Sequence, residues 1–176
     1  IYIWDYSYYE SKYQKKFHHV DSNELTSFFP LNQVLNGFFE VVGKLFQIEF
    51  HEEEPGSFYQ WHEDVRLFRV EDSETGSLGY FYLDLFPRTG KFGHAAAFGL
   101  LSGRRRTDGQ YQAPVSAMVC NFTKHAPSLL SHREVETLWH EFGHILHNVL
   151  TNAEFFRFSG THVATDFVEA PSQVLE

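Results

Sequence analysis

The sequence predicts an α+β fold in which a metal-binding helix packs against a small, mostly antiparallel sheet, with further helices on the flanks. Two observations lead to this fold class. The stretch from Leu138 to His147 has helical periodicity and carries a His-Glu-x-x-His motif. Residues 58–125, by contrast, contain short runs typical of strands, separated by turns.

The His-Glu-x-x-His motif places two metal-ligating side chains on one face of a helix. Residues four apart stack one turn above the other, so His140 and His144 point the same way and can hold one metal ion between them. Glu141 is offset by about 100° of rotation, which sets it beside the metal, within reach of a water molecule there. This arrangement is typical of zinc peptidases.

The boundaries and faces of this helix are also predicted. Ser131 and Glu134 form a capping-box pattern at its start. Gly143 costs about 1 kcal/mol relative to alanine in a helix interior, which indicates that another segment approaches the helix backbone closely. The apolar positions are Val135, Leu138, Trp139, Phe142, Ile145, Leu146 and Val149.

A third protein ligand is needed, because catalytic zinc usually has three together with water. One known pattern requires Gly and His where this chain has His147 and Leu150, so that pattern is excluded. The remaining candidates lie downstream: they are Glu154, Glu169 and Glu176. Glu154 follows the helix too closely to fold back, whereas the longer connection to Glu169 lets the chain return antiparallel.

The spacing favours Glu169 over Glu176 without excluding Glu176. A second helix around Glu169 is predicted to be capped by Thr165 or Asp166.

The remaining elements follow from periodicity and turn residues. Further helices are predicted at 5–17 and from Pro30 through Leu45, and strands at 48–50, 65–70, 78–86, 92–100 and 115–122. The strands at 65–70 and 78–86 form an antiparallel hairpin. The strand at 115–122 is apolar on both faces and therefore central, and residues 104–109 form a polar hairpin tip.

Composition limits the partners of the chain. Fourteen basic and 23 acidic residues give a formal charge of −9, which argues against a nucleic-acid surface. Cys120 is the only cysteine, so no internal disulfide is possible, which is consistent with a reducing, cytoplasmic location. No apolar run approaches the roughly 18 residues of a membrane span, and no signal peptide is visible, so we expect no membrane partner.

Several long motifs are spread along the chain, within and outside the predicted metal-binding helix. They are WDYSYY (4–9), FPL (29–31), DLFPR (84–88), KFGHAAAFG (91–99), NFTK (121–124), HEFGHILH (140–147) and FSGTHVATDFVEAPSQVLE (158–176). With these motifs the chain resembles peptidase family M3, the group of zinc peptidases that includes thimet oligopeptidase, neurolysin and oligopeptidase A. The resemblance covers nearly the whole chain.

The resemblance implies a zincin-like catalytic domain that hydrolyses short peptides. It implies one Zn²⁺ per chain, held by His140, His144 and Glu169, with Glu141 as general base. The resemblance, and not the spacing, selects Glu169 as the third ligand.

The resemblance also bears on the small-residue run at 92–100, which includes Ala95 and Ala96. On the residues alone, tight packing against the metal helix and addition of an extended peptide to a sheet edge explain this run equally well. The family resemblance favours the edge strand, with Ala95 and Ala96 at the substrate.

Three other side chains have expected roles near the site. His162 either reaches the substrate or makes a structural hydrogen bond. Glu136 lies one turn before His140, and Asp166 one turn before Glu169, so that either could orient a ligand or lie at the surface.

The chain begins at Ile1 without Met and stops at Glu176, and members of the family are longer. We therefore expect one partial catalytic domain over 1–176, with a helical region at 1–50, a sheet region at 58–125 and zinc-binding helices at 131–176. Its expected partner is the remainder of a parent chain, which in this family supplies Tyr and His groups for the tetrahedral intermediate. The alternative is a zinc-binding or peptide-binding fragment without turnover.

Overall fold

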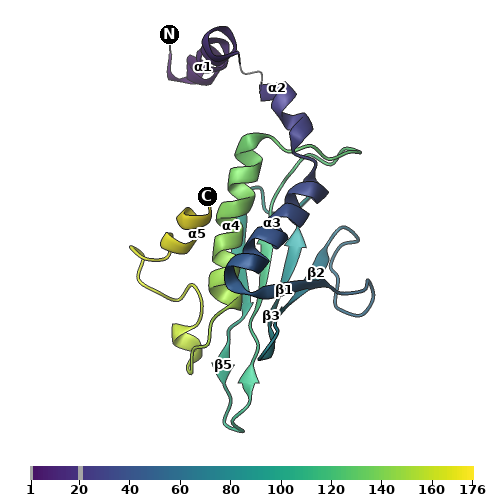
Figure 1. Ribbon diagram of the computed structural model, residues 1–176, viewed down its shortest axis with the longest axis vertical. Helices are drawn as coiled ribbons and strands as arrows, with labels where there is room; N and C mark the ends of the chain where they lie inside the picture. The colour runs from purple at the N-terminus through teal and green to yellow at the C-terminus, as the bar shows by residue number, and fades with distance from the viewer. Residues whose placement is uncertain (1, 20–21) are drawn as a thin grey trace.

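A computed structural model describes residues 2–19 and 22–176. A sheet forms one layer, and helices α3 and α4 pack side by side across one of its faces (Figure 1). The helices are α1 (Tyr6–Tyr13), α2 (Ser22–Leu25), α3 (Leu31–Phe46), α4 (His132–Val149) and α5 (Ala170–Leu175), with short helical segments at Ile3–Asp5, Gln14–His18, Thr26–Phe28 and Phe156–Phe158. Residues 1, 20 and 21 of the predicted helical region lie outside the described residues.

The main sheet has the strand order β1-β2-β3-β7-β4. Its strands are β1 (Ile48–Glu52), β2 (Arg66–Asp72), β3 (Gly76–Asp84), β4 (Ala96–Leu101) and β7 (Val115–Val119), and a separate hairpin is formed by β5 (Arg104–Arg105) and β6 (Tyr111–Gln112). Strand β7 returns between β3 and β4, parallel to β3 and antiparallel to β4. The other neighbouring pairs are antiparallel, which confirms the predicted fold class, hairpin and central strand.

The core lies between the two helices and the sheet. In α3 the buried side chains recur at helical spacing, at Leu31, Leu35, Phe38 and Val42. Phe142 of α4 packs edge-on against Phe38, with ring centroids 4.4 Å apart, and against Phe81 of β3 at 5.0 Å. This aromatic contact fixes α4 against the sheet.

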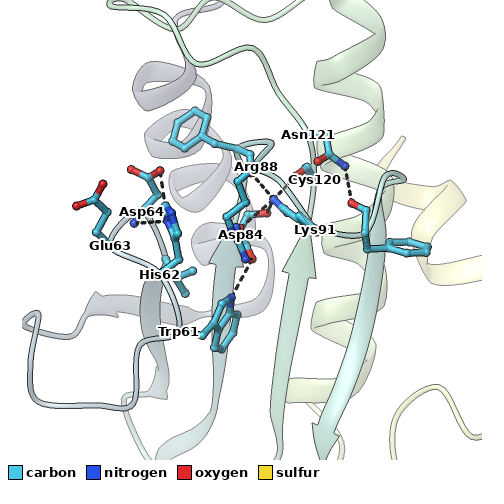
Figure 2. A network of polar contacts seen from close by, with 12 residues as sticks. Trp61, His62, Glu63, Asp64, Asp84, Arg88, Lys91, Cys120 and Asn121 are labelled. Atoms are coloured by element: carbon cyan, nitrogen blue, oxygen red, sulfur yellow. Dashed lines mark hydrogen bonds and ion pairs between the residues drawn. The ribbon is translucent and has the colours of Figure 1, made fainter.

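Several predicted boundaries are wrong. Strands β3 and β7 end at Asp84 and Val119, before the predicted residues 86 and 122. Strand β4 begins at Ala96 and not at residue 92. The side-chain amide of Asn121 donates to the carbonyl of Phe92 at 3.0 Å (Figure 2) and to that of His94 at 3.4 Å, and thus holds this stretch as a loop. Helix α5 begins at Ala170 and not near a cap at Thr165 or Asp166. Pro171 suits a first helical turn because its missing N–H needs no partner there. Pro30 precedes α3 as its N-cap and does not lie in its first turn.

A buried network of charges joins the ends of β3 and β7 (Figure 2). Arg88 donates two hydrogen bonds to the Asp84 carboxylate, at 2.7 and 2.8 Å, and the Trp61 indole donates a third at 2.9 Å. The Lys91 ammonium lies 2.9 Å from the same carboxylate and donates to the carbonyls of Asp84, Phe86 and Cys120. Lys91 therefore ties the loop before β4 to both central strands.

Burial would raise the pKa of Asp84, but hydrogen bonds from Arg88, Trp61 and Lys91 outweigh it and lower the pKa to about 2. Because the folded pKa lies below the ordinary value, ionised Asp84 stabilises the fold above about pH 4. This contribution is lost as the pH falls toward 2.

We expect Asp84→Asn to lower the free energy of unfolding at pH 7 by about 3 kcal/mol, because it leaves the buried Lys91 without its counter-ion. In urea unfolding, the difference between wild type and variant should shrink as the pH falls from 4 toward 2. A difference that stays constant with pH would contradict this role. Glu40→Gln, which breaks an exposed pair with Lys44, is the control and should leave the urea midpoint unchanged.

Candidate metal centre

Three side chains from two segments converge at one point beside α4. His140 and His144 project from α4, and Glu169 is the residue that immediately precedes α5. One ligand atom from each lies within 4.8 Å of the others. Oε2 of Glu169 is 3.3 Å from Nε2 of His140 and 3.1 Å from Nε2 of His144. The structure thus brings together the three residues that the sequence predicted as ligands.

Gly143 allows this convergence. A Cβ atom built on Gly143 would lie 2.4 Å from the Cα of Ser172 and 2.9 Å from its backbone nitrogen, so any larger residue would displace α5. The buried Ser172 hydroxyl lies 3.0 Å from the Glu169 carboxylate and 2.8 Å from its carbonyl oxygen, as a donor to each. The predicted close approach at Gly143 is confirmed, and it brings Glu169 to the two histidines.

Two of the three ligand-to-ligand distances in the cluster fit a tetrahedral zinc ion. Zinc bonds to histidine nitrogen and carboxylate oxygen are about 2.0–2.2 Å long, so neighbouring ligand atoms of a tetrahedral site lie about 3.3 Å apart. The Nε2 to Oε2 distances, at 3.3 and 3.1 Å, match this spacing. The side chains of His140 and Glu169 are 27% and 49% exposed, so the site is open on one side to a further ligand.

Glu141 interacts with both histidines and with the backbone of Ala97. Burial raises the pKa of Glu141 above its ordinary value, and this exceeds the opposing effects of His144, His140 and a hydrogen bond from the backbone N–H of Ala97. Because Ala97 belongs to β4, Glu141 lies against the edge strand of the sheet. This link is not visible in the sequence, since it depends on how α4 crosses β4.

The residues predicted to contact substrate have different surroundings. Ala96 is the first residue of β4, and Ala95 immediately precedes it. Among the described residues β4 pairs with β7 alone, so its other edge is open for an added strand. His162 is exposed, and its ring Nδ1 lies 2.8 Å from the carbonyl of Ser159. This contact corresponds to a structural hydrogen bond, which the sequence offered as the alternative to a substrate contact.

The two acids that could either orient a ligand or lie at the surface do not contact His140 or His144. Glu136 pairs with His132 at 3.2 Å, and Asp166 is exposed with no interaction among the described residues. The acid that lies beside His140 is Glu176, with its Oε2 3.1 Å from Nδ1 of the imidazole. Glu169 and Glu176 are two helical turns apart, which predicts that their side chains lie on the same face of a helix. This spacing is the signal in the sequence that could have identified Glu176 as a residue near the histidines.

The described part of the chain contains no helix that is both long and apolar enough to cross a membrane. The cytoplasmic location predicted from the single cysteine remains a prediction.

Comparison with known proteins gives a consistent result. The model of peptidase family M3 matches residues 1–176. The chain is 43% identical to a thimet-like oligopeptidase of Dictyostelium discoideum, over 99% of the chain and 26% of that protein. It is 40% identical to a mitochondrial intermediate peptidase of Arabidopsis thaliana, over 98% and 25%, and 40% identical to oligopeptidase A of Escherichia coli, over 98% and 26%.

The chain therefore spans about a quarter of the length of the curated relatives it matches. The family match covers every residue, including the metal helix and the Glu169 segment. This chain belongs to peptidase family M3.

Proposed function

We propose that the chain carries the catalytic centre of a zinc-dependent metalloendopeptidase that hydrolyses peptide bonds in short peptides. The observation that supports this most strongly is the convergence of His140, His144 and Glu169 beside the half-buried Glu141. The names of two relatives, which describe them as oligopeptidases, support peptides as the substrate class.

In this proposal His140, His144 and Glu169 hold one zinc ion per chain. Zinc bound there would polarise a peptide carbonyl and lower the pKa of water toward about 7. Glu141 takes a proton from the attacking water and returns it to the leaving nitrogen. Burial raises the pKa of Glu141 above its ordinary value, which makes its carboxylate a better proton acceptor.

The open edge of β4 is proposed to align the substrate. An extended peptide added at Ala96 would pair with backbone groups of β4, which bind without regard to side-chain identity. The Ala97 N–H already contacts Glu141, so a peptide on this edge would lie close to the general base.

A second candidate is a zinc-binding or peptide-binding piece that does not turn over substrate. The observation that favours it is the coverage of about a quarter of each relative, because other parts of those proteins could contribute catalytic groups. Loss of one oxyanion donor alone would lower the rate by about 10²–10³.

Metal removal tests the proposal. We expect the chain to cleave a quenched fluorescent peptide, to lose this activity with a chelator and to regain it with one equivalent of zinc. One bound zinc per chain without cleavage would support the second candidate. Cleavage that persists after complete metal removal would contradict a metallopeptidase.

A further inference from the structure

Both ring nitrogens of His140 face a carboxylate. Nε2 lies 3.3 Å from Oε2 of Glu169, and Nδ1 lies 3.1 Å from Oε2 of Glu176. His144 differs, because its Nδ1 is buried and has no hydrogen-bond partner among the described residues. The two proposed zinc ligands on α4 are therefore held in different ways.

This geometry determines where the His140 proton must lie when a metal is bound. A neutral imidazole carries one N–H, and the nitrogen that binds a cation must offer its lone pair. If Nε2 binds the metal, the proton is on Nδ1, and this N–H donates a hydrogen bond to the Glu176 carboxylate. Such a contact fixes both the tautomer and the rotation of the ring, and it increases the basicity of the ligating nitrogen.

The position of Glu176 depends on how α5 lies against α4. Glu169 and Glu176 flank α5 at its two ends, as N-cap and C-cap. Seven residues make about two helical turns, so the two side chains share one face. Contact of α5 with Gly143 turns this face toward α4, which places one carboxylate at each nitrogen of His140.

The other acid near this part of α4 is not available for the same role. Glu136 lies one turn before His140, but its carboxylate pairs with His132 at 3.2 Å. The Glu176 side chain is 47% exposed, so its removal should disturb packing little. Variants at Glu176 can therefore test ligand orientation separately from folding.

We propose that Glu176 is a positioning residue that holds His140 in the Nδ1–H tautomer and in the orientation that metal binding requires. The inference rests on the proposed zinc site. It assigns a role to Glu176, which spacing alone left as an alternative to Glu169 for the third metal ligand.

The test compares zinc affinity in Glu176→Ala, Glu176→Gln and the control Glu136→Ala, by competition with a chromophoric chelator at pH 7. We expect Glu176→Ala to weaken zinc binding by roughly 10- to 100-fold. Glu176→Gln should recover most of this loss, since its amide oxygen still accepts from Nδ1–H. Glu136→Ala should bind zinc as the wild type does.

A spectroscopic measurement accompanies the affinities. In the zinc-loaded, ¹⁵N-labelled wild type, the His140 Nδ1–H should give a proton signal protected from rapid exchange, and Glu176→Ala should lose it. A merely structural role of Glu176 would leave this signal in place. Thermal unfolding of the metal-free variants shows whether each one is folded.

The outcomes separate the inference from the proposed function. Wild-type affinity in Glu176→Ala would overturn the inference and leave the zinc site intact. Equal weakening in Glu176→Ala and Glu136→Ala would also overturn it, because it would indicate a general charge effect. A wild-type chain that binds no zinc would overturn the proposed function and the inference together.

Discussion

Replacement of Glu141 by glutamine should lower kcat for peptide hydrolysis by about 10²–10⁴ and leave one zinc ion bound per chain. The amide keeps the size of the side chain but cannot accept a proton from water. Glu141 is not among the three residues whose ligand atoms lie within 4.8 Å of one another, so metal binding should not depend on it.

The measurement pairs the rate of cleavage of a quenched fluorescent peptide with zinc content determined by mass spectrometry. Glu136→Gln is the control, because it makes the same chemical change one turn away from the cluster, at a residue paired with His132. It should retain both activity and zinc. If Glu141→Gln lost zinc together with activity, Glu141 would be a ligand or a structural residue and not a base.

Gly143→Ala should both destabilise the protein and weaken its zinc binding. The added Cβ would lie 2.4 Å from the Cα of Ser172, and backbone at that distance must move. Glu169 should move with α5, so the proposed third ligand would leave the histidines. Overpacking of this kind costs about 1–3 kcal/mol, more than the approximately 1 kcal/mol that alanine gains over glycine in a helix.

Gly37→Ala in α3 provides the matched control. A Cβ at Gly37 meets nothing within 4 Å, so the same change should stabilise the protein by about 0.5–1 kcal/mol through helix propensity alone. Urea unfolding of the metal-free proteins and zinc competition give both readouts. Equal stabilisation by the two substitutions, with zinc affinity unchanged, would contradict the role of Gly143.

Helix α4 could be predicted because its signals are local in sequence. The capping box of Ser131 and Glu134 is present as predicted, with Oε2 of Glu134 2.7 Å from the Ser131 backbone nitrogen. Gly143 indicated a close approach without identifying the segment that makes it. That segment proves to be the start of α5.

What could not be predicted depends on packing between distant segments. The start of β4 is set by Asn121, whose amide occupies carbonyls that a longer strand would have used. The partner of His140 is set by the position of α5 on α4, which brings in Glu176 where local spacing pointed to Glu136. Spacing restricted the proposed third ligand to a few acids and the family resemblance selected Glu169, which the fold places beside both histidines.

The most direct test of the metal centre is anomalous diffraction at the zinc edge from crystals of the chain with one equivalent of zinc. We predict a single peak about 2.0–2.2 Å from Nε2 of His140, Nε2 of His144 and a carboxylate oxygen of Glu169, with Glu176 on the far side of the His140 ring. A peak coordinated by Glu176 in place of Glu169, or one away from the two histidines, would contradict the proposed site.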